Sequence, residues 1–383
     1  MGTKSIASER DLRFDFFRGL ALLFICINHI EGGVRLKTLA VVTIHTAGLY
    51  DHGMTFVFIS GMMYGYINEK IYLNHGLPMM WARSVIRAVQ VYFFQILLLT
   101  VVLGIAGVYL HHSNDWELMN YVHLEPYLKG DFIYFSRFLL FDHFPLFFDI
   151  LPLYILLLMV MPLCLYGINK RPYLTTFIAF VIYVISAFIA YFGPGRYLPL
   201  YNGAFILTIW QMLFLIGMIL GVKKRSGTLR ISYEKRYLYP AIAWVAFTFV
   251  NEKLLFEIND FVVKINPLFL HHIPYTARRY LPPHRLLSFF ILIYVVSYFV
   301  RGDSKLFKNA IGRAIISCGQ QSLEVFTFGV FLAYSGTFFV KGFGGGRPLL
   351  VITEIFMLLL TVAFAYYLKW RKREPWRQVP SMV

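Results

Sequence analysis

Long runs of apolar residues, separated by short polar segments, make up most of this chain of 383 residues. A helix needs about 20 mainly apolar residues to cross the hydrocarbon core of a bilayer. By this length we predict an all-α, polytopic membrane protein, and because the runs leave no room for a large soluble domain, we expect one transmembrane domain over 1–383. The ten predicted helices are 14–31, 53–69, 88–110, 149–168, 173–192, 203–221, 238–256, 285–300, 320–340 and 349–368.

Composition supports the same class of protein. Hydrophobic residues make up 58% of the chain, charged residues only 15%, and the mean hydropathy is +0.62. A soluble domain carries about 25% charged residues. No small-residue cleavage site follows a short apolar core at the N-terminus, so we expect 14–31 to remain as a helix.

The distribution of basic residues predicts the orientation in the membrane. If the ten helices alternate in direction, 24 of the 36 Lys and Arg residues lie on the N-terminal side. Basic residues concentrate in cytoplasmic loops, so we predict that both termini are cytoplasmic. The net charge of +16 is then mostly a topology signal, which argues against nucleic-acid binding. The three cysteines predict no disulfide, and no Cys/His spacing predicts a metal site.

Two ionisable residues in the first apolar run have a spacing that suits a functional site. Arg18 and His29 are eleven residues apart, which returns a helix to within about 20° of the same face. They are then about 16 Å apart along the axis. Ionisable groups inside a bilayer are costly and usually mark a site or a pathway. The structural alternative is that Arg18 extends to the membrane surface and His29 is an ordinary satisfied polar residue.

Further basic residues predict a phosphate-binding cluster near Arg18. Arg83 and Arg87 are four residues apart and share a helix face, and Asp15 lies one turn before Arg18, where it can orient the guanidinium. Arginine suits bidentate binding of phosphate. The alternative is ordinary positive charge at the cytoplasmic start of a helix.

The exported side of the predicted topology has candidate residues for catalysis and for binding a sugar. Glu354 is expected at the depth of His29, and its candidate partners are His29 or a remote Arg or Tyr. Asn28 and Ser60 are candidates to orient His29 or to stabilise an oxyanion. Long loops at 111–148 and 257–284 hold aromatic and polar residues, a combination that suits sugar recognition but is also typical of an aromatic belt. The candidate substrate-binding residues are Trp116, Asp142, His143 and Asp149.

At Arg18 and His29 the chain resembles the acyltransferase family 3 superfamily of membrane acyltransferases. RGLALLFICINH matches its Arg–His signature, FVFISG matches an aromatic–Ser–Gly signature, and Arg83 and Arg87 match a basic entry to the next helix. Within it, the chain is most similar to the OpgC family, named for succinylation of osmoregulated periplasmic glucans. The supporting stretches are RDLRFDFFRGLALLFICINHI, FVFISGMMYGY, DILPLYILLLMVMP, WQMLFLIG and GQQSLEVF. Glu31 departs from the pattern, which would place a proline after INHI.

The resemblance implies a multi-pass enzyme of the bacterial inner membrane. Cytoplasmic acyl-CoA would bind through its phosphates to Arg18, Arg83 and Arg87, with no bound cofactor. His29 would act as general base on a glycan hydroxyl, or would carry the acyl group transiently. The acyl group would be succinyl and the acceptor a periplasmic glucan; acetyl transfer to another surface glycan is the alternative. A glycan or solute transporter is the competing class, because buried ionisable groups also line transport pathways, and a membrane receptor or scaffold is a weaker reading. A transporter would move solute without releasing CoA.

Overall fold

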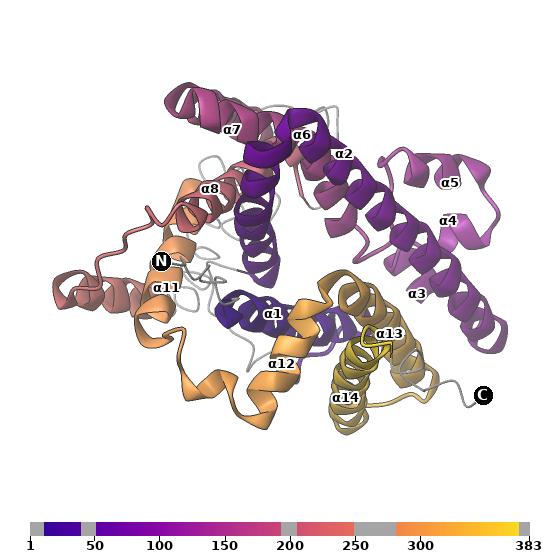
Figure 1. Cartoon of the computed structure of the whole chain (residues 1–383). Coiled ribbons are helices and arrows are strands. Elements are labelled where there is room, and N and C mark those ends of the chain that lie inside the picture. Colours follow the sequence, from indigo (N-terminus) through magenta and orange to yellow (C-terminus); the bar gives the residue numbers. More distant parts are fainter. Residues whose placement is uncertain (1–10, 40–50, 193–204, 249–280, 375–383) are drawn as a thin grey trace, which may run out of the picture.

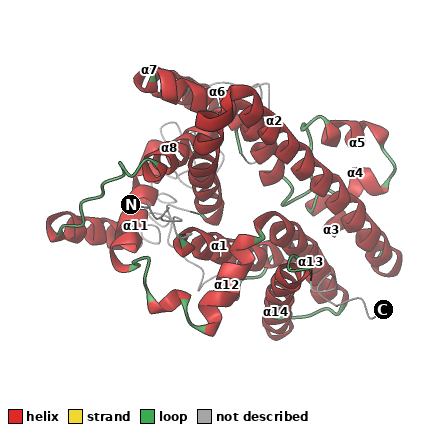
Figure 2. Cartoon of the chain, viewed as in Figure 1, coloured by secondary structure: helices red, strands yellow, loops and turns green. Residues whose placement is uncertain are grey.

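Helices are the only regular secondary structure in the part of the chain that the structure, a computed structural model, describes (Figure 2). The described residues are 11–39, 51–192, 205–248 and 281–374. Residues 235–248 are helical, and a 3-10 turn spans Lys305–Phe307. The remaining helices are α1 (Leu12–Val34), α2 (His52–Ser113), α3 (Trp116–Tyr121), α4 (Glu125–Leu128), α5 (Phe132–Leu139), α6 (Ile150–Lys170), α7 (Pro172–Phe192), α8 (Leu207–Arg225), α11 (Pro283–Phe299), α12 (Ala310–Gln320), α13 (Ser322–Gly342) and α14 (Arg347–Arg371).

The predicted all-α membrane class is confirmed for the described residues. Seven helices among them are long and apolar enough to cross a bilayer, and α11 is apolar but shorter. One of the seven, α2, covers the two predicted helices 53–69 and 88–110. The chain turns between them at Gly76, where φ is 76°, and Pro78 starts the second half. The predicted helix 238–256 lies partly outside the described residues, so the count of ten and the orientation remain predictions.

Four of the described helices were not predicted: the short helices α3, α4 and α5, in a segment that we expected to be a loop, and α12. A single helix was predicted to begin at residue 320, but α12 already runs from Ala310 to Gln320, and α13 begins at Ser322. Asn309 caps α12 by accepting a hydrogen bond from the Gly312 backbone N–H at 2.6 Å. The apolar signal of α12 was short and followed a basic segment, so it was read as the end of a cytoplasmic loop.

Helix α1 is the element around which the candidate site is built. It contacts α2, α12, α13 and α14, and Figure 1 shows it between the α12–α14 group and the elements α2, α6 and α8. Among the described helices, α2 also contacts α6, α8 and α13. The core between these helices contains fully buried aromatic side chains such as Trp210, Phe214 and Tyr334.

Glycines let α1 and α12 approach each other backbone to backbone. A Cβ atom on Gly19 would lie 1.9 Å from the carbonyl oxygen of Ile315, and one on Gly319 would lie 1.8 Å from that of Asp15. No side chain fits at either distance. Small residues at helix crossings permit this close approach in membrane proteins, where packing replaces the hydrophobic effect as the force between helices.

The same device joins α2 to α8. A Cβ on Gly61 would lie 2.2 Å from the Phe214 carbonyl oxygen, and a Cβ on Gly217 would lie 2.3 Å from the Phe58 carbonyl oxygen. The aromatic–Ser–Gly stretch singled out in the sequence therefore includes a glycine with a packing role, next to Ser60.

The segment between α2 and α6 folds back over the end of α1. Tyr121 donates a hydrogen bond to the Gly32 carbonyl at 2.8 Å, and Tyr334 of α13 donates to the Leu146 carbonyl at 2.6 Å. These bonds place the start of α6 beside the C-terminal half of α1.

Gly61→Ala should destabilise the protein, because the added methyl group must push two helix backbones apart. Overpacking of this kind costs about 1–3 kcal/mol. Gly104→Ala is the matched control on α2: no atom lies within 4 Å of its added Cβ, and alanine favours the helix. Thermal unfolding of the purified protein in detergent should show a lower midpoint for Gly61→Ala only. Equal midpoints for the two variants would contradict the packing account.

Candidate functional site

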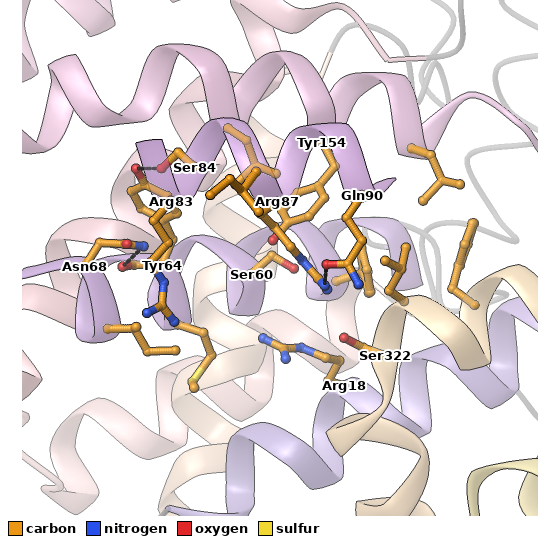
Figure 3. Close-up of a pocket in the computed structure, with 18 residues that line it drawn as sticks. Arg18, Ser60, Tyr64, Asn68, Arg83, Ser84, Arg87, Gln90, Tyr154 and Ser322 are labelled. Atoms are coloured by element: carbon orange, nitrogen blue, oxygen red, sulfur yellow. Dashed lines mark hydrogen bonds between the residues drawn. The ribbon is translucent and has the colours of Figure 1, made fainter. Parts of the chain in front are cut away.

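A cavity of about 470 Å³ contains the three arginines that the sequence analysis grouped together. Arg18 enters it from α1, and Arg83 and Arg87 enter it from the second half of α2 (Figure 3). We call it the arginine cavity. None of the described residues that line it carries a carboxylate. Three guanidinium groups in one wall make a pocket suited to a polyanionic ligand.

Two of the arginines donate hydrogen bonds to acceptors on α2. Arg83 and Arg87 lie one turn apart, as predicted, and Arg87 donates a 2.7 Å hydrogen bond to the side-chain oxygen of Gln90. Arg18 donates to the Ile59 carbonyl of α2 at 3.4 Å. The structure thus brings these three side chains together, while phosphate binding by them stays a prediction.

Neutral polar side chains complete the wall of the arginine cavity. Tyr64 and Ser84 share a 2.8 Å hydrogen bond across the two halves of α2, and Asn68 donates to the Tyr64 carbonyl at 3.0 Å. Tyr154 and Ser322 line the cavity from α6 and α13 (Figure 3). Tyr64 and Tyr154 were missed because tyrosines in apolar runs resemble an ordinary aromatic belt.

His29 lines a second, smaller cavity of about 70 Å³. Its imidazole stacks on the ring of Phe147, with centroids 4.1 Å apart and 18° between the ring planes. Asn28 and Asp149 line the same cavity. We call it the histidine cavity. It therefore holds a base candidate, an amide and a carboxylate, the groups that bond and deprotonate a hydroxyl.

Asp51 and His52 also line the histidine cavity and were not predicted. Asp51 caps α2 by accepting a hydrogen bond from the Met54 backbone N–H at 2.8 Å, and it forms a buried ion pair with Arg285 at 3.2 Å. An aspartate directly before an apolar helix is a recognisable N-cap signal. That signal could have placed Asp51 at the start of α2, but not beside His29.

A family model described as OpgC protein matches residues 10–373, nearly the whole chain. The chain belongs to the OpgC family. The resemblance noted in the sequence is confirmed at the level of this family, which suggests a glucan-modifying acyltransferase. Neither a curated protein nor a solved structure matches the chain.

Three residues predicted near the reacting groups of this OpgC protein lie elsewhere. Ser60 is buried and lines the arginine cavity, not the histidine cavity. Asp15 is absent from the lining of the arginine cavity, and the side chain of Gln320 in α12 contacts its carboxylate at 3.5 Å. Asp15 therefore has a neighbour on α12 as well as its place one turn before Arg18 on α1, and its role in orienting Arg18 stays a prediction.

Glu354 is the third. It is fully buried in α14 and accepts a hydrogen bond from the Thr38 hydroxyl at 2.8 Å. Thr38 also donates to Glu31, through its backbone N–H at 2.6 Å and its hydroxyl at 3.0 Å. Glu31, where the family pattern led us to expect proline, therefore ties the segment after α1 to α14. Glu354 belongs to this cluster and does not line the histidine cavity.

The predicted substrate-binding residues separate into two groups. Asp149 lines the histidine cavity. The others lie in the α3–α5 segment, with contacts of their own: Asp142 pairs with Arg137 at 2.6 Å, and Trp116 lies under the Lys129 ammonium at 5.4 Å. His143 Nδ1 lies 2.9 Å from the Tyr127 hydroxyl. None of these three lines either cavity.

His143 therefore acts as a packing residue in this segment, and its titration should be visible in stability. Burial, with the nearby charge of Arg137, lowers the pKa of His143 below its usual value. Below a pH of about 6.5, His143 takes up a proton in the unfolded chain, whereas in the folded protein it stays neutral to lower pH. The stability of the folded protein therefore decreases as the pH is lowered. Lowering the pH from about 7.5 to about 5.5 should reduce the unfolding midpoint of wild type more than that of His143→Gln. An equal reduction in both proteins would contradict this assignment.

Proposed function

We propose that this OpgC protein is an integral membrane O-acyltransferase that moves a succinyl group from cytoplasmic acyl-CoA to a hydroxyl of a periplasmic glucan. The observation on which this depends is the arrangement along α1. Arg18 lines a large positive cavity, and His29, eleven residues further along the helix, lines a small cavity rich in hydrogen-bonding groups. Membership of the OpgC family supports the choice of succinyl and glucan.

The arginine cavity is the donor site in this proposal. CoA carries several phosphate charges, and arginine binds phosphate through two parallel hydrogen bonds. Arg18, Arg83 and Arg87 would hold these phosphates near the cytoplasmic end of α1. The rise of α1 between Arg18 and His29 is about 16 Å, a distance comparable with an extended pantetheine arm.

His29 is the general base. It takes the proton of the glucan hydroxyl while the hydroxyl oxygen attacks the thioester carbonyl carbon. The C–S bond breaks, the ester forms, and the proton passes to the CoA thiolate. Asn28 and Asp149 line the same cavity and would orient the hydroxyl. A histidine with a near-neutral pKa suits this role at pH 7.

Location in the bacterial inner membrane follows from the same proposal. Acyl-CoA is cytoplasmic and the glucan is periplasmic, so the two substrates must meet within the bilayer. The outer face of the second half of α2 supports a bilayer environment, because Phe93 and Leu97 are 73% and 54% exposed there. The distribution of basic residues predicts that Arg18 lies on the cytoplasmic side.

Arg18→Lys and Arg83→Ala should each weaken CoA binding. Lysine keeps the charge of Arg18 but loses the planar fork, and alanine removes the contact altogether. A charge-assisted hydrogen bond contributes about 1.5–3 kcal/mol, so each Kd should rise about ten- to a hundredfold. Arg171→Ala is the matched control, since this exposed arginine lies outside the cavity. Titration calorimetry with CoA would measure all three. Wild-type affinity in both cavity variants would place the donor elsewhere.

His29→Ala should abolish acyl transfer and leave folding and CoA affinity close to wild type. Loss of a general base costs about a hundred- to ten-thousandfold in rate. The assay is glucan acylation by purified protein supplied with succinyl-CoA, followed by mass spectrometry. His112→Ala, an exposed histidine at the end of α2, serves as control. Substantial acylation by a well-folded His29→Ala protein would refute the mechanism.

A further inference from the structure

The two cavities have one lining residue in common, Phe326 of α13. The two cavities also come close together at α6, where consecutive residues line different cavities: Leu151 lines the arginine cavity and Ile150 the histidine cavity. The Phe326 side chain therefore borders both cavities.

Phe326 closes this boundary with little solvent contact. Its side chain is only 3% exposed, and its ring lies 6.0 Å from that of Phe56, which lines the arginine cavity. Ser322, one turn earlier on α13, is small and also lines the arginine cavity. A phenylalanine has two side-chain torsions, and helical side chains lean over the preceding turn. The small side chain at Ser322 leaves space on the donor side of the ring.

We infer that Phe326 is a partition between donor and acceptor, a residue that controls access of the thioester to His29 and keeps water on the acceptor side away from a waiting donor. This inference rests on the proposed function. Phe326 is a positioning residue in this account, because it lines both the arginine cavity and the histidine cavity but takes no part in proton transfer.

The chemical need for such a partition is specific to acyl transfer. A thioester can react with water as well as with a sugar hydroxyl. In hydrolysis, water attacks the carbonyl carbon, the C–S bond breaks, the free acid forms, and the thiolate takes the proton. Exclusion of water suppresses such side reactions in closed active sites. If the Phe326 ring moves aside only when the acyl arm is inserted and the acceptor fills the histidine cavity, transfer to the sugar is favoured over hydrolysis of the thioester.

The test measures CoA release with and without acceptor in the full-length protein in lipid nanodiscs, with succinyl-CoA as donor and a short β-glucan as acceptor. Phe326→Ala removes the partition, and Phe326→Trp enlarges it. Phe338→Ala is the control: Phe338 is on the same helix, is 6% exposed and stacks on Tyr109 outside both cavities. Rates are expressed per folded protein, and CoA affinity is measured for each variant.

For Phe326→Ala we expect acceptor-free CoA release to rise about tenfold relative to transfer, with unchanged CoA affinity. For Phe326→Trp we expect kcat for transfer to fall while KM for the donor stays constant. Phe338→Ala should change only the yield of folded protein. A wild-type ratio of release to transfer in Phe326→Ala would overturn the inference while leaving the proposed function intact. Absence of acyl transfer by the wild-type protein would overturn the proposed function and this inference with it.

Discussion

Backbone contact at glycines fixes the helix that holds the candidate site. Helix α1 is held near its start, where Gly19 meets the Ile315 carbonyl of α12, and near its end, where a Cβ on Gly33 would lie 2.2 Å from the Thr337 hydroxyl of α13. Arg18 lies next to Gly19, and His29 lies between Gly19 and Gly33. These contacts oppose sliding and rotation of α1 against its neighbours. Because Arg18 and His29 are on one continuous helix, helix geometry sets their separation.

Buried polar groups fix the helix ends around the histidine cavity in a similar way. The Asp51–Arg285 pair joins the start of α2 to α11, with both side chains about 5% exposed. Thr38 connects Glu31 to Glu354. A buried ion pair contributes little net stability once its desolvation is counted, but breaking one is costly. The effect of these contacts is to allow one arrangement of helix ends around the histidine cavity.

The sequence predicted what depends on spacing within one helix. Apolar run length predicted the membrane helices, and the interval between Arg83 and Arg87 predicted their common face. Contacts between helices were harder to predict. Ser60 was a candidate to orient His29 because both are polar and lie in apolar runs, yet Ser60 lines the arginine cavity and His29 the histidine cavity. Phe147 and Asp51 come from segments distant in sequence, and only tertiary packing brings them to His29.

The two cavities differ in their linings, and this difference suits the proposed acyl transfer better than transport of one solute. The arginine cavity is lined by three arginines and by no described carboxylate, whereas the histidine cavity is lined by Asn28, His29 and Asp149, and by Asp51, whose charge is paired with Arg285. In the proposed reaction the CoA phosphates stay among the arginines, and only the acyl end of the donor, with its single carboxylate, reaches His29. A sugar hydroxyl needs only the hydrogen-bonding groups of the histidine cavity. A single solute crossing the membrane would have to satisfy both environments in turn, whereas in the proposed transfer the CoA phosphates and the acceptor sugar each meet only one of them.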